Sequence, residues 1–168
     1  IISLLPSARQ FWLDAGASPD VLDRATFAIA DLPTGLAGVT EGSLIKLDAS
    51  GAGWGWFVDS TPEAHSEFLA TNQTTDFVAS ANSDAAGKLD LLTVMIHELG
   101  HVLGLPDVHG DQQNMSQYLQ PGQRRLPDAF DLAMLSNAGS AYYYGLDGVT
   151  RVVSPSQLIP QTVLPPAT

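Results

Sequence analysis

The chain of 168 residues contains no cysteine and few basic side chains, with 7 lysines and arginines against 18 aspartates and glutamates. The lack of cysteine excludes a disulfide framework, a thiolate metal site and a cysteine nucleophile. The net charge of -11 argues against nucleic acid as a partner, because its phosphates would repel the protein. Long apolar runs are also missing. No stretch approaches the roughly 20 apolar residues that span a bilayer, so we expect no membrane insertion.

The chain does contain enough apolar sequence, 45% of its residues, for one ordinary domain. We expect this domain to cover residues 1–153, with an amino-terminal lobe over about 1–104 and a carboxy-terminal lobe over about 105–153. Residues 154–168 carry several prolines and are expected to form a tail or linker. The first residues lack the basic and apolar regions of a signal peptide, so we expect a mature or trimmed segment.

Periodic apolar residues and turn residues predict the regular elements of this domain. A stretch rich in small polar residues before the most apolar segment predicts a long loop. Helices are expected over 5–15, from 18, from 88–90 onward and over 128–135, strands over 26–30, 35–39 and 43–48, and the loop over 71–87.

The sequence HELGH at residues 97–101 places two histidines four residues apart. On a helix, His97 and His101 lie one turn apart on the same face, so both rings can face one metal ion. Glu98 projects to the side of that point and is the candidate general base. The flanking residues are apolar nearly all round, which predicts a buried helix. Burial of these polar groups without a cation would be costly, which opposes the alternative of two ordinary surface histidines.

The residues after His101 offer a third metal ligand. Gly104 can end the helix in a left-handed conformation, and Pro106 prevents the helix from resuming. Asp107, three residues past the glycine, can return to the metal, and a carboxylate oxygen is an acceptable zinc ligand. His109 is the rival third ligand, and a plain loop histidine is its alternative interpretation.

With Met115 eight residues beyond Asp107, the pattern resembles the signature of the metzincin zinc endopeptidases, HExxHxxGxxH followed by a methionine-containing turn. The usual third histidine of that family is an aspartate in this chain. Over roughly residues 27–127 the chain also resembles matrixin-like metalloprotease domains of bacterial exported or surface proteins. The segments that carry this resemblance are SLIKLDASGAGWGWFVDSTPEAHSEF, GKLDLLTVMIHELGHVLGL and LQPGQRRLP.

The resemblance implies an α/β (α+β) metzincin fold, with a twisted, mostly parallel sheet, an antiparallel edge strand and a small carboxy-terminal lobe. It implies Zn²⁺ held by His97, His101 and Asp107, Glu98 as the general base and Met115 in the turn beneath the metal. The substrate would be an extended polypeptide that adds to the edge strand. The protein would be secreted or on the bacterial cell surface, as a monomeric catalytic domain of a larger protein.

Three further residues are candidates for the site. Tyr118 could donate a hydrogen bond to an oxyanion, as a tyrosine after the turn methionine does in some relatives, with a packed tyrosine as the alternative. Asp48 and Asp59 are candidate Ca²⁺ ligands.

An aromatic cluster and one further histidine lie outside the zinc signature. Trp54, Trp56 and Phe57 could line a cleft, but we favour packing in the core. His65 is expected on the surface. Two other functions stay open. The zinc site could belong to a non-catalytic surface module, or to a metallohydrolase of a non-peptide amide or ester, because zinc ligands and a glutamate do not specify the substrate.

Overall fold

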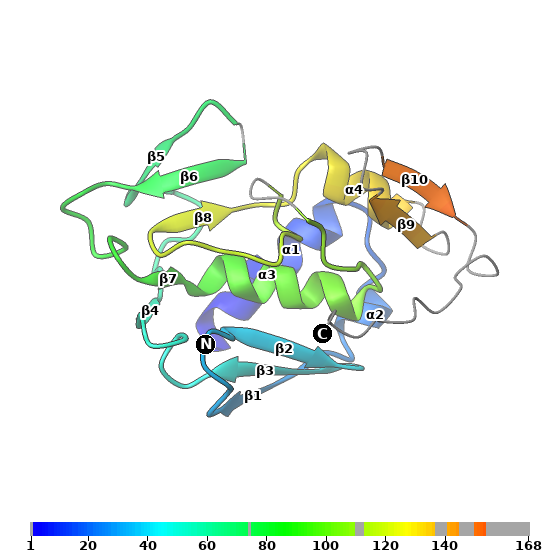
Figure 1. Ribbon diagram of the computed structural model, residues 1–168, viewed down its shortest axis with the longest axis horizontal. Helices are drawn as coiled ribbons and strands as arrows, with labels where there is room; N and C mark the ends of the chain where they lie inside the picture. Colours follow the sequence, from blue (N-terminus) through cyan, green and yellow to red (C-terminus); the bar gives the residue numbers. More distant parts are fainter. Residues whose placement is uncertain (1, 74, 110–112, 137–140, 145–149, 154–168) are drawn as a thin grey trace, which may run out of the picture.

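The protein has a mixed α+β fold, which confirms the fold class expected at the coarse level (Figure 1). Within the part of the chain that the structure describes, no helix is long and apolar enough to cross a membrane. The predicted tail over 154–168 lies outside that part, and the division into two lobes stays a prediction. The computed structural model describes residues 2–73, 75–109, 113–136, 141–144 and 150–153.

A helix lies in each of the four regions where the sequence predicts one, with bounds that differ by a few residues. Their bounds are Leu5–Asp14 for α1, Pro19–Leu22 for α2, Leu91–Val102 for α3 and Ala129–Ser136 for α4, with a 3-10 turn, η1, over Ile2–Leu4.

Helix α3 is the centre of the core, as its nearly all-apolar sequence predicts. Asp90 caps its first turn and accepts a hydrogen bond from the backbone N–H of Thr93, which satisfies one of the free donors at the helix start. Helix α1 packs against α3 (Figure 1). Trp12 of α1 is fully buried, and its Nε1 donates to the carbonyl of Ile96 over 2.8 Å. The hydrogen bond and the buried ring therefore hold the two helices together.

A three-stranded sheet in the order β1-β3-β2 lies beside α3 (Figure 1). Strand β3 pairs in parallel with β1 and antiparallel with β2, so β2 is an antiparallel edge strand next to the helix. The sequence predicts all three strands, but β2 starts at residue 38 and not at 35. Leu36 donates to the carbonyl of Pro33, and Gly35 has φ of 89°, so residues 33–36 form a turn. The bounds are Thr26–Ala30 for β1, Gly38–Glu41 for β2 and Leu44–Asp48 for β3.

In the described part of the chain the strands form four small sheets and not the single sheet expected. One small sheet contains β5, β6 and β8, and β6 falls within 71–87, so the prediction of a plain loop there is wrong. Strand β6 pairs with β8, which lies more than 40 residues later, and local sequence patterns do not report such pairing. The remaining strands are β4 (Trp56–Phe57), β5 (Phe68–Ala70), β6 (Asp76–Ala79), β7 (Leu89–Asp90), β8 (Gln123–Arg125), β9 (Ala141–Tyr144) and β10 (Thr150–Val153).

A buried arginine joins these small sheets to the start of α3. Arg124 on β8 is fully buried and binds both carboxylate oxygens of Asp90, over 2.9 and 2.8 Å. Its Nη1 lies 2.8 Å from Oδ2 of Asp59, and its guanidinium stacks over the ring of Phe68. Two buried carboxylates therefore balance one buried cation. We call Arg124, Asp59 and Asp90 the buried ion cluster.

His65 belongs to the surroundings of this cluster, so its expected place on the surface is wrong. Its ring is half-buried and stacks on Phe77, with the ring centroids 4.7 Å apart. Nδ1 lies 3.2 Å from Nη1 of Arg124, which requires Nδ1 to accept. Burial and the nearby Arg124 cation both lower the pKa of His65, because both disfavour a charged imidazole.

A His65→Asn variant is expected to lose part of the acid sensitivity of the fold. Because the pKa of His65 is lowered in the folded protein, the unfolded chain binds a proton at this residue at a higher pH, near 6.5, than the folded protein does. The free energy of unfolding therefore falls as the pH drops below about 6.5. Asparagine tolerates the positive φ of 49° and has no proton to gain. The measurement is urea unfolding of both proteins at pH 8 and pH 5.5. The other histidines are common to both proteins, and an unchanged pH difference would exclude this role.

Candidate metal centre

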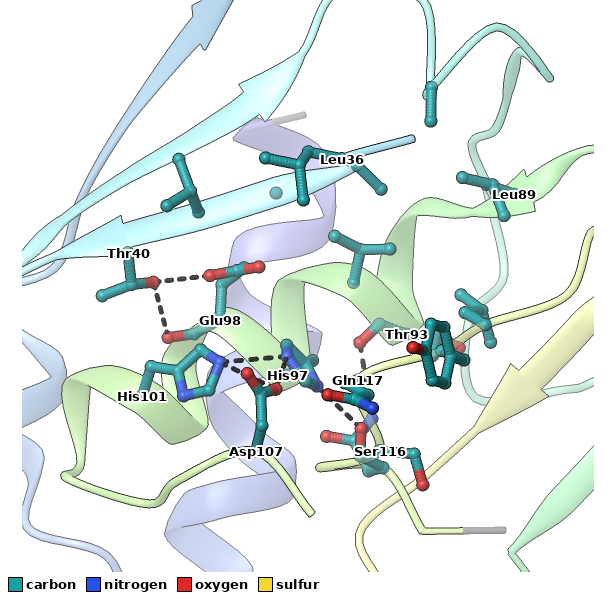
Figure 2. Close-up of a pocket in the computed structure, with 18 of the residues that line it drawn as sticks. Leu36, Thr40, Leu89, Thr93, His97, Glu98, His101, Asp107, Ser116 and Gln117 are labelled. Atoms are coloured by element: carbon teal, nitrogen blue, oxygen red, sulfur yellow. Dashed lines mark hydrogen bonds and ion pairs between the residues drawn. The ribbon is translucent and has the colours of Figure 1, made fainter. Parts of the chain in front are cut away.

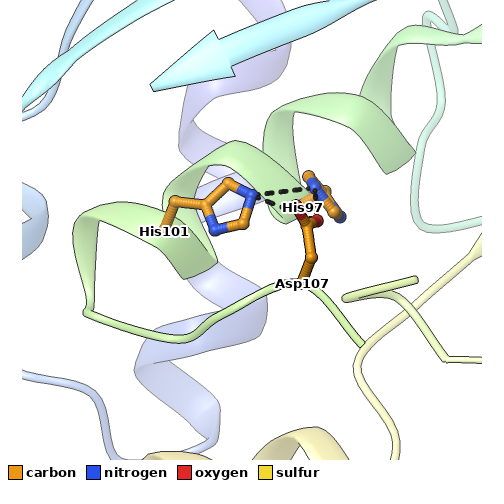
Figure 3. Close-up of side chains that lie close together, drawn as sticks. All are labelled: His97, His101 and Asp107. Atoms are coloured by element: carbon orange, nitrogen blue, oxygen red, sulfur yellow. Dashed lines mark hydrogen bonds and ion pairs between the residues drawn. The ribbon is translucent and has the colours of Figure 1, made fainter. Parts of the chain in front are cut away.

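Three side chains from two neighbouring segments converge at one end of α3 (Figure 3). His97 and His101 lie one turn apart on α3, and their Nε2 atoms are 3.0 Å apart. Oδ1 of Asp107 lies 3.3 Å from the first of these atoms and 3.5 Å from the second. Among the described residues these three form a group that could hold a metal ion. The structure thus brings together the two histidines and the aspartate that the sequence predicts as ligands.

The end of α3 places the second histidine and the aspartate. Gly104 has φ of 89°, and its N–H donates to the carbonyl of His101, while Leu105 donates to the carbonyl of Gly100. This pair of hydrogen bonds is the Schellman ending, which glycine adopts without steric cost. The turn also places the carbonyl of Leu105 at 2.8 Å from Nδ1 of His101. One short turn therefore reverses the chain toward Asp107 and orients the ring of His101.

The first histidine is oriented by a segment farther along the chain. Nδ1 of His97 lies 2.9 Å from the backbone carbonyl of Asn114. The side-chain amide of Asn114 donates to the carbonyl of Arg125 over 3.1 Å, which fixes this segment in the interior. Asp131, which is fully buried, accepts hydrogen bonds from the backbone N–H of Asn114 and Met115. Burial raises the pKa of Asp131 to about 6.

Met115 lies directly under α3. It is fully buried, and a side chain at Gly100 would meet its sulfur and the ring of Trp12. Gly100 adopts no left-handed backbone conformation, so the need for glycine here is one of space. Met115 therefore contacts the backbone of the helix turn that carries the two histidines.

The hydrogen bonds at Nδ1 decide which ring nitrogens can bind a cation. Because a carbonyl can only accept, Nδ1 of each histidine donates, and each neutral ring presents its lone pair at Nε2. Two lone pairs and a carboxylate oxygen then face one another, an arrangement that repels itself until a cation enters. When a ring carries a second proton in place of a cation, its Nε2–H donates to Asp107, and these hydrogen bonds from His101 and His97 hold the pKa of Asp107 well below its usual range. Burial opposes charge on His101, but Asp107 and the carbonyl of Leu105 outweigh it and raise the pKa of His101. The group therefore attracts positive charge.

Glu98 lies on the other side of the histidines, against the edge strand. It is 4% exposed, and its Oε2 accepts a hydrogen bond of 2.7 Å from Oγ1 of Thr40 on β2 (Figure 2). Glu98 is not part of the group that could hold a metal ion.

The group of His97, His101 and Asp107, which we call the metal group because it could hold an ion, opens into a cleft of about 670 Å³ between β2 and the segment that follows Met115 (Figure 2). Trp54 and Tyr118 both line this cleft with exposed side chains, 59% and 65% respectively. The prediction of a core position is therefore wrong for Trp54. Trp56 packs against the core and Phe57 is buried, as expected.

The rival third ligand lies away from the group. His109 is exposed, and its Nδ1 lies 3.2 Å from Nε2 of Gln117. Among the described residues it does not join the group of His97, His101 and Asp107. The geometry therefore favours Asp107.

Replacement of Asp107 by alanine is expected to weaken metal retention far more than replacement of His109 by alanine. The first change removes an oxygen that lies 3.3 and 3.5 Å from the two ring nitrogens. The second removes a side chain whose partner is Gln117. Metal content after equal dialysis of the two variants is the measurement. A greater loss from the His109 variant would show that the third ligand is two residues later.

The two candidate calcium ligands have protein partners. Oδ2 of Asp48 accepts from the N–H groups of Ser50 and Ala52 and from the Ser50 hydroxyl, and Oδ1 accepts from the N–H of Leu32. The hydrogen bond from the Ser50 hydroxyl is the largest cause that lowers the pKa of Asp48 to about 2. Asp59 belongs to the buried ion cluster. These contacts give both residues a structural role, and calcium binding stays a prediction.

The carbonyls of Leu105 and Asn114, which orient the histidines, are missing from the sequence predictions. A backbone carbonyl carries no residue-type signal, so only the turn at Gly104 hints at the first of them. Gly38 and Thr40 beside Glu98 are missing as well. A glycine inside a strand pattern is the signal that could have pointed to them, because it often marks a close approach.

Comparison with known proteins adds no relative: no family model matches this chain, and no curated protein or solved structure matches it.

Proposed function

We propose that the protein is a zinc-dependent endopeptidase of the metzincin type. The observation that carries this proposal is the convergence of His97, His101 and Asp107 at a cleft whose wall holds the separate carboxylate of Glu98. Catalytic zinc sites have three protein ligands and keep one position open, whereas structural sites use four. The signature HExxHxxGxxD and Met115 support the same assignment.

The spacing of the donor atoms suits zinc. In a tetrahedron with bonds of roughly 2.0–2.1 Å, two ligand atoms lie about 3.3 Å apart. The three separations among the Nε2 atoms and Oδ1 of Asp107 are 3.0, 3.3 and 3.5 Å. Two imidazoles and a carboxylate, without sulfur, also form a ligand set that zinc accepts.

Each residue of the site has a separate role in the proposed hydrolysis. Zinc, when bound, would polarise the scissile carbonyl and make water more acidic. Glu98 accepts a proton from the attacking water and returns it to the leaving amine. The carbonyls of Leu105 and Asn114 keep the histidines in the tautomer that binds metal. Tyr118 lies exposed on the cleft wall and would donate a hydrogen bond to the oxyanion.

An extended peptide is the substrate that the cleft favours. Strand β2 pairs on one side with β3, and its residues Gly38, Val39 and Thr40 line the cleft. A peptide that adds to the free side of β2 would pass the metal group in an extended conformation. We further propose a secreted or cell-surface bacterial protein in which this chain is a monomeric catalytic domain, with Ca²⁺ as an additional ligand.

Metal analysis combined with a peptidase assay tests the proposal. We expect about one zinc per chain in protein purified without chelator, cleavage of quenched peptides, loss of cleavage with a chelator, and recovery after zinc is added. Absence of any transition metal would contradict the proposal. Zinc without cleavage of peptides or small esters would favour a binding module, and cleavage of esters alone would favour the non-peptide hydrolase.

A further inference from the structure

We propose that the edge strand β2 positions the catalytic base, with Thr40 as an anchor for the Glu98 carboxylate and Gly38 as the space in which it lies. This inference rests on the proposed role of Glu98 as the general base. It assigns Thr40 and Gly38 as positioning residues, because both act through Glu98.

The first observation is the hydrogen bond from Thr40. Its Oγ1 lies 2.7 Å from Oε2 of Glu98 and 3.2 Å from the backbone carbonyl of Glu98 (Figure 2). The hydroxyl has one proton, and the carboxylate oxygen is the nearer acceptor. Glu98 is almost completely buried, so its carboxylate needs a donor to offset the loss of water. Among the described residues, Thr40 is the donor bonded to this carboxylate, and no donor is bonded to Oε1. Thr40 therefore holds one oxygen of the carboxylate, and the other oxygen, Oε1, lies beside Gly38.

The second observation is the missing side chain at Gly38. A Cβ atom at this position would lie 2.5 Å from Oε1 and 2.9 Å from Cδ and Cγ of Glu98, closer than atoms pack. Gly38 has no positive φ, so its backbone conformation does not require glycine. Glycine inside a strand weakens the strand and often marks a close approach of another group. Here the approaching group is the Glu98 carboxylate.

The periodicity of a strand explains why the two residues act together. Residues two apart on a strand share a face, so Gly38 and Thr40 both face α3. One carboxylate oxygen of Glu98, with Cδ and Cγ, lies against Gly38, and the other oxygen accepts the hydrogen bond from Thr40. If the substrate adds to the free side of β2, the same strand holds the base and the peptide. Their relative position would then be set by one rigid element, which is what proton transfer requires.

Three variants test this inference: Thr40→Val, Thr40→Ser and Gly38→Ala. Valine matches the shape of threonine without the hydroxyl, serine keeps the hydroxyl, and alanine adds the Cβ that would meet Glu98. We expect kcat to fall by about 10- to 100-fold for the valine and alanine variants, the range seen when a supporting partner is removed. KM and zinc content should change little, and the serine variant should keep most of kcat. Thr26→Val is the matched control, because Thr26 lies on β1 away from the cleft.

Crystal structures of the wild type and of the Thr40→Val and Gly38→Ala variants give a readout that does not depend on activity. We expect the Glu98 carboxylate to leave its wild-type position in both variants while α3 and the metal group stay in place. An unmoved carboxylate, a wild-type kcat in the valine variant, or an equal loss in the serine variant would overturn the inference. An inactive wild type would instead overturn the proposed function, and the crystal structures would still decide whether β2 positions Glu98.

Discussion

The Glu98→Gln variant is expected to lose about 10²- to 10⁴-fold in kcat, the contribution typical of a positioned general base. Glutamine has the shape of glutamate but cannot take a proton from water. Its side-chain oxygen can still accept the hydrogen bond from Thr40, so the fold and the place of the side chain should be kept. The measurement is steady-state cleavage of a quenched peptide, with zinc content determined on the same sample.

The zinc content separates the two ways in which Glu98 could matter. Because Glu98 is not part of the converging group, the variant should hold as much zinc as the wild type. Wild-type activity in this variant would remove Glu98 from the mechanism. Loss of zinc together with activity would make Glu98 a structural residue of the metal centre.

Replacement of Arg124 by methionine is expected to lower the free energy of unfolding by about 3–5 kcal/mol, the usual effect of breaking a buried ion pair on one side. Methionine keeps much of the length of the side chain, so the loss reports mainly on charge. Asp59 and Asp90, with side chains only 1% exposed, would lose their cation. The free energy of unfolding follows from urea titration, with the same metal content in both proteins because a bound ligand stabilises the fold.

A surface ion pair provides the matched control. Lys46 and Glu41 form a pair at 2.8 Å whose side chains are 31% and 61% exposed. Because solvent screens such pairs, Lys46→Met should change the free energy of unfolding by only about 0.2–1 kcal/mol. Equal effects of the two substitutions would show that the buried ion cluster contributes no more than an exposed pair.

The buried ion cluster also supports the helix that carries the candidate metal ligands. Asp90 accepts from Arg124 and, through the same carboxylate, from the backbone N–H of Thr93 in the first turn of α3. Arg124 therefore supports the start of the helix that carries His97 and His101. We therefore expect the Arg124→Met variant to lose part of its metal in addition to stability.

The sequence by itself determined the parts of this protein that depend on short-range geometry. His97 and His101 meet because a helix repeats every turn, and Asp107 returns because Gly104 and Pro106 end that helix at once. The apolar surroundings of the motif likewise placed α3 in the core. In each case the spacing within one short segment specifies the contact, so the residues can be interpreted without knowledge of the rest of the chain.

Only the tertiary structure decided the contacts between segments far apart in sequence. The carbonyl of Asn114 orients His97, and a backbone carbonyl looks the same in every residue. Arg124 lies beside Asp59 and Asp90, and its strand β8 pairs with β6, a strand inside the stretch 71–87 that the sequence predicts as a loop. Thr40 reaches Glu98 because β2 lies beside α3, across 58 residues of chain. Such contacts depend on how the elements pack, and packing is a property of the whole chain and not of any one segment.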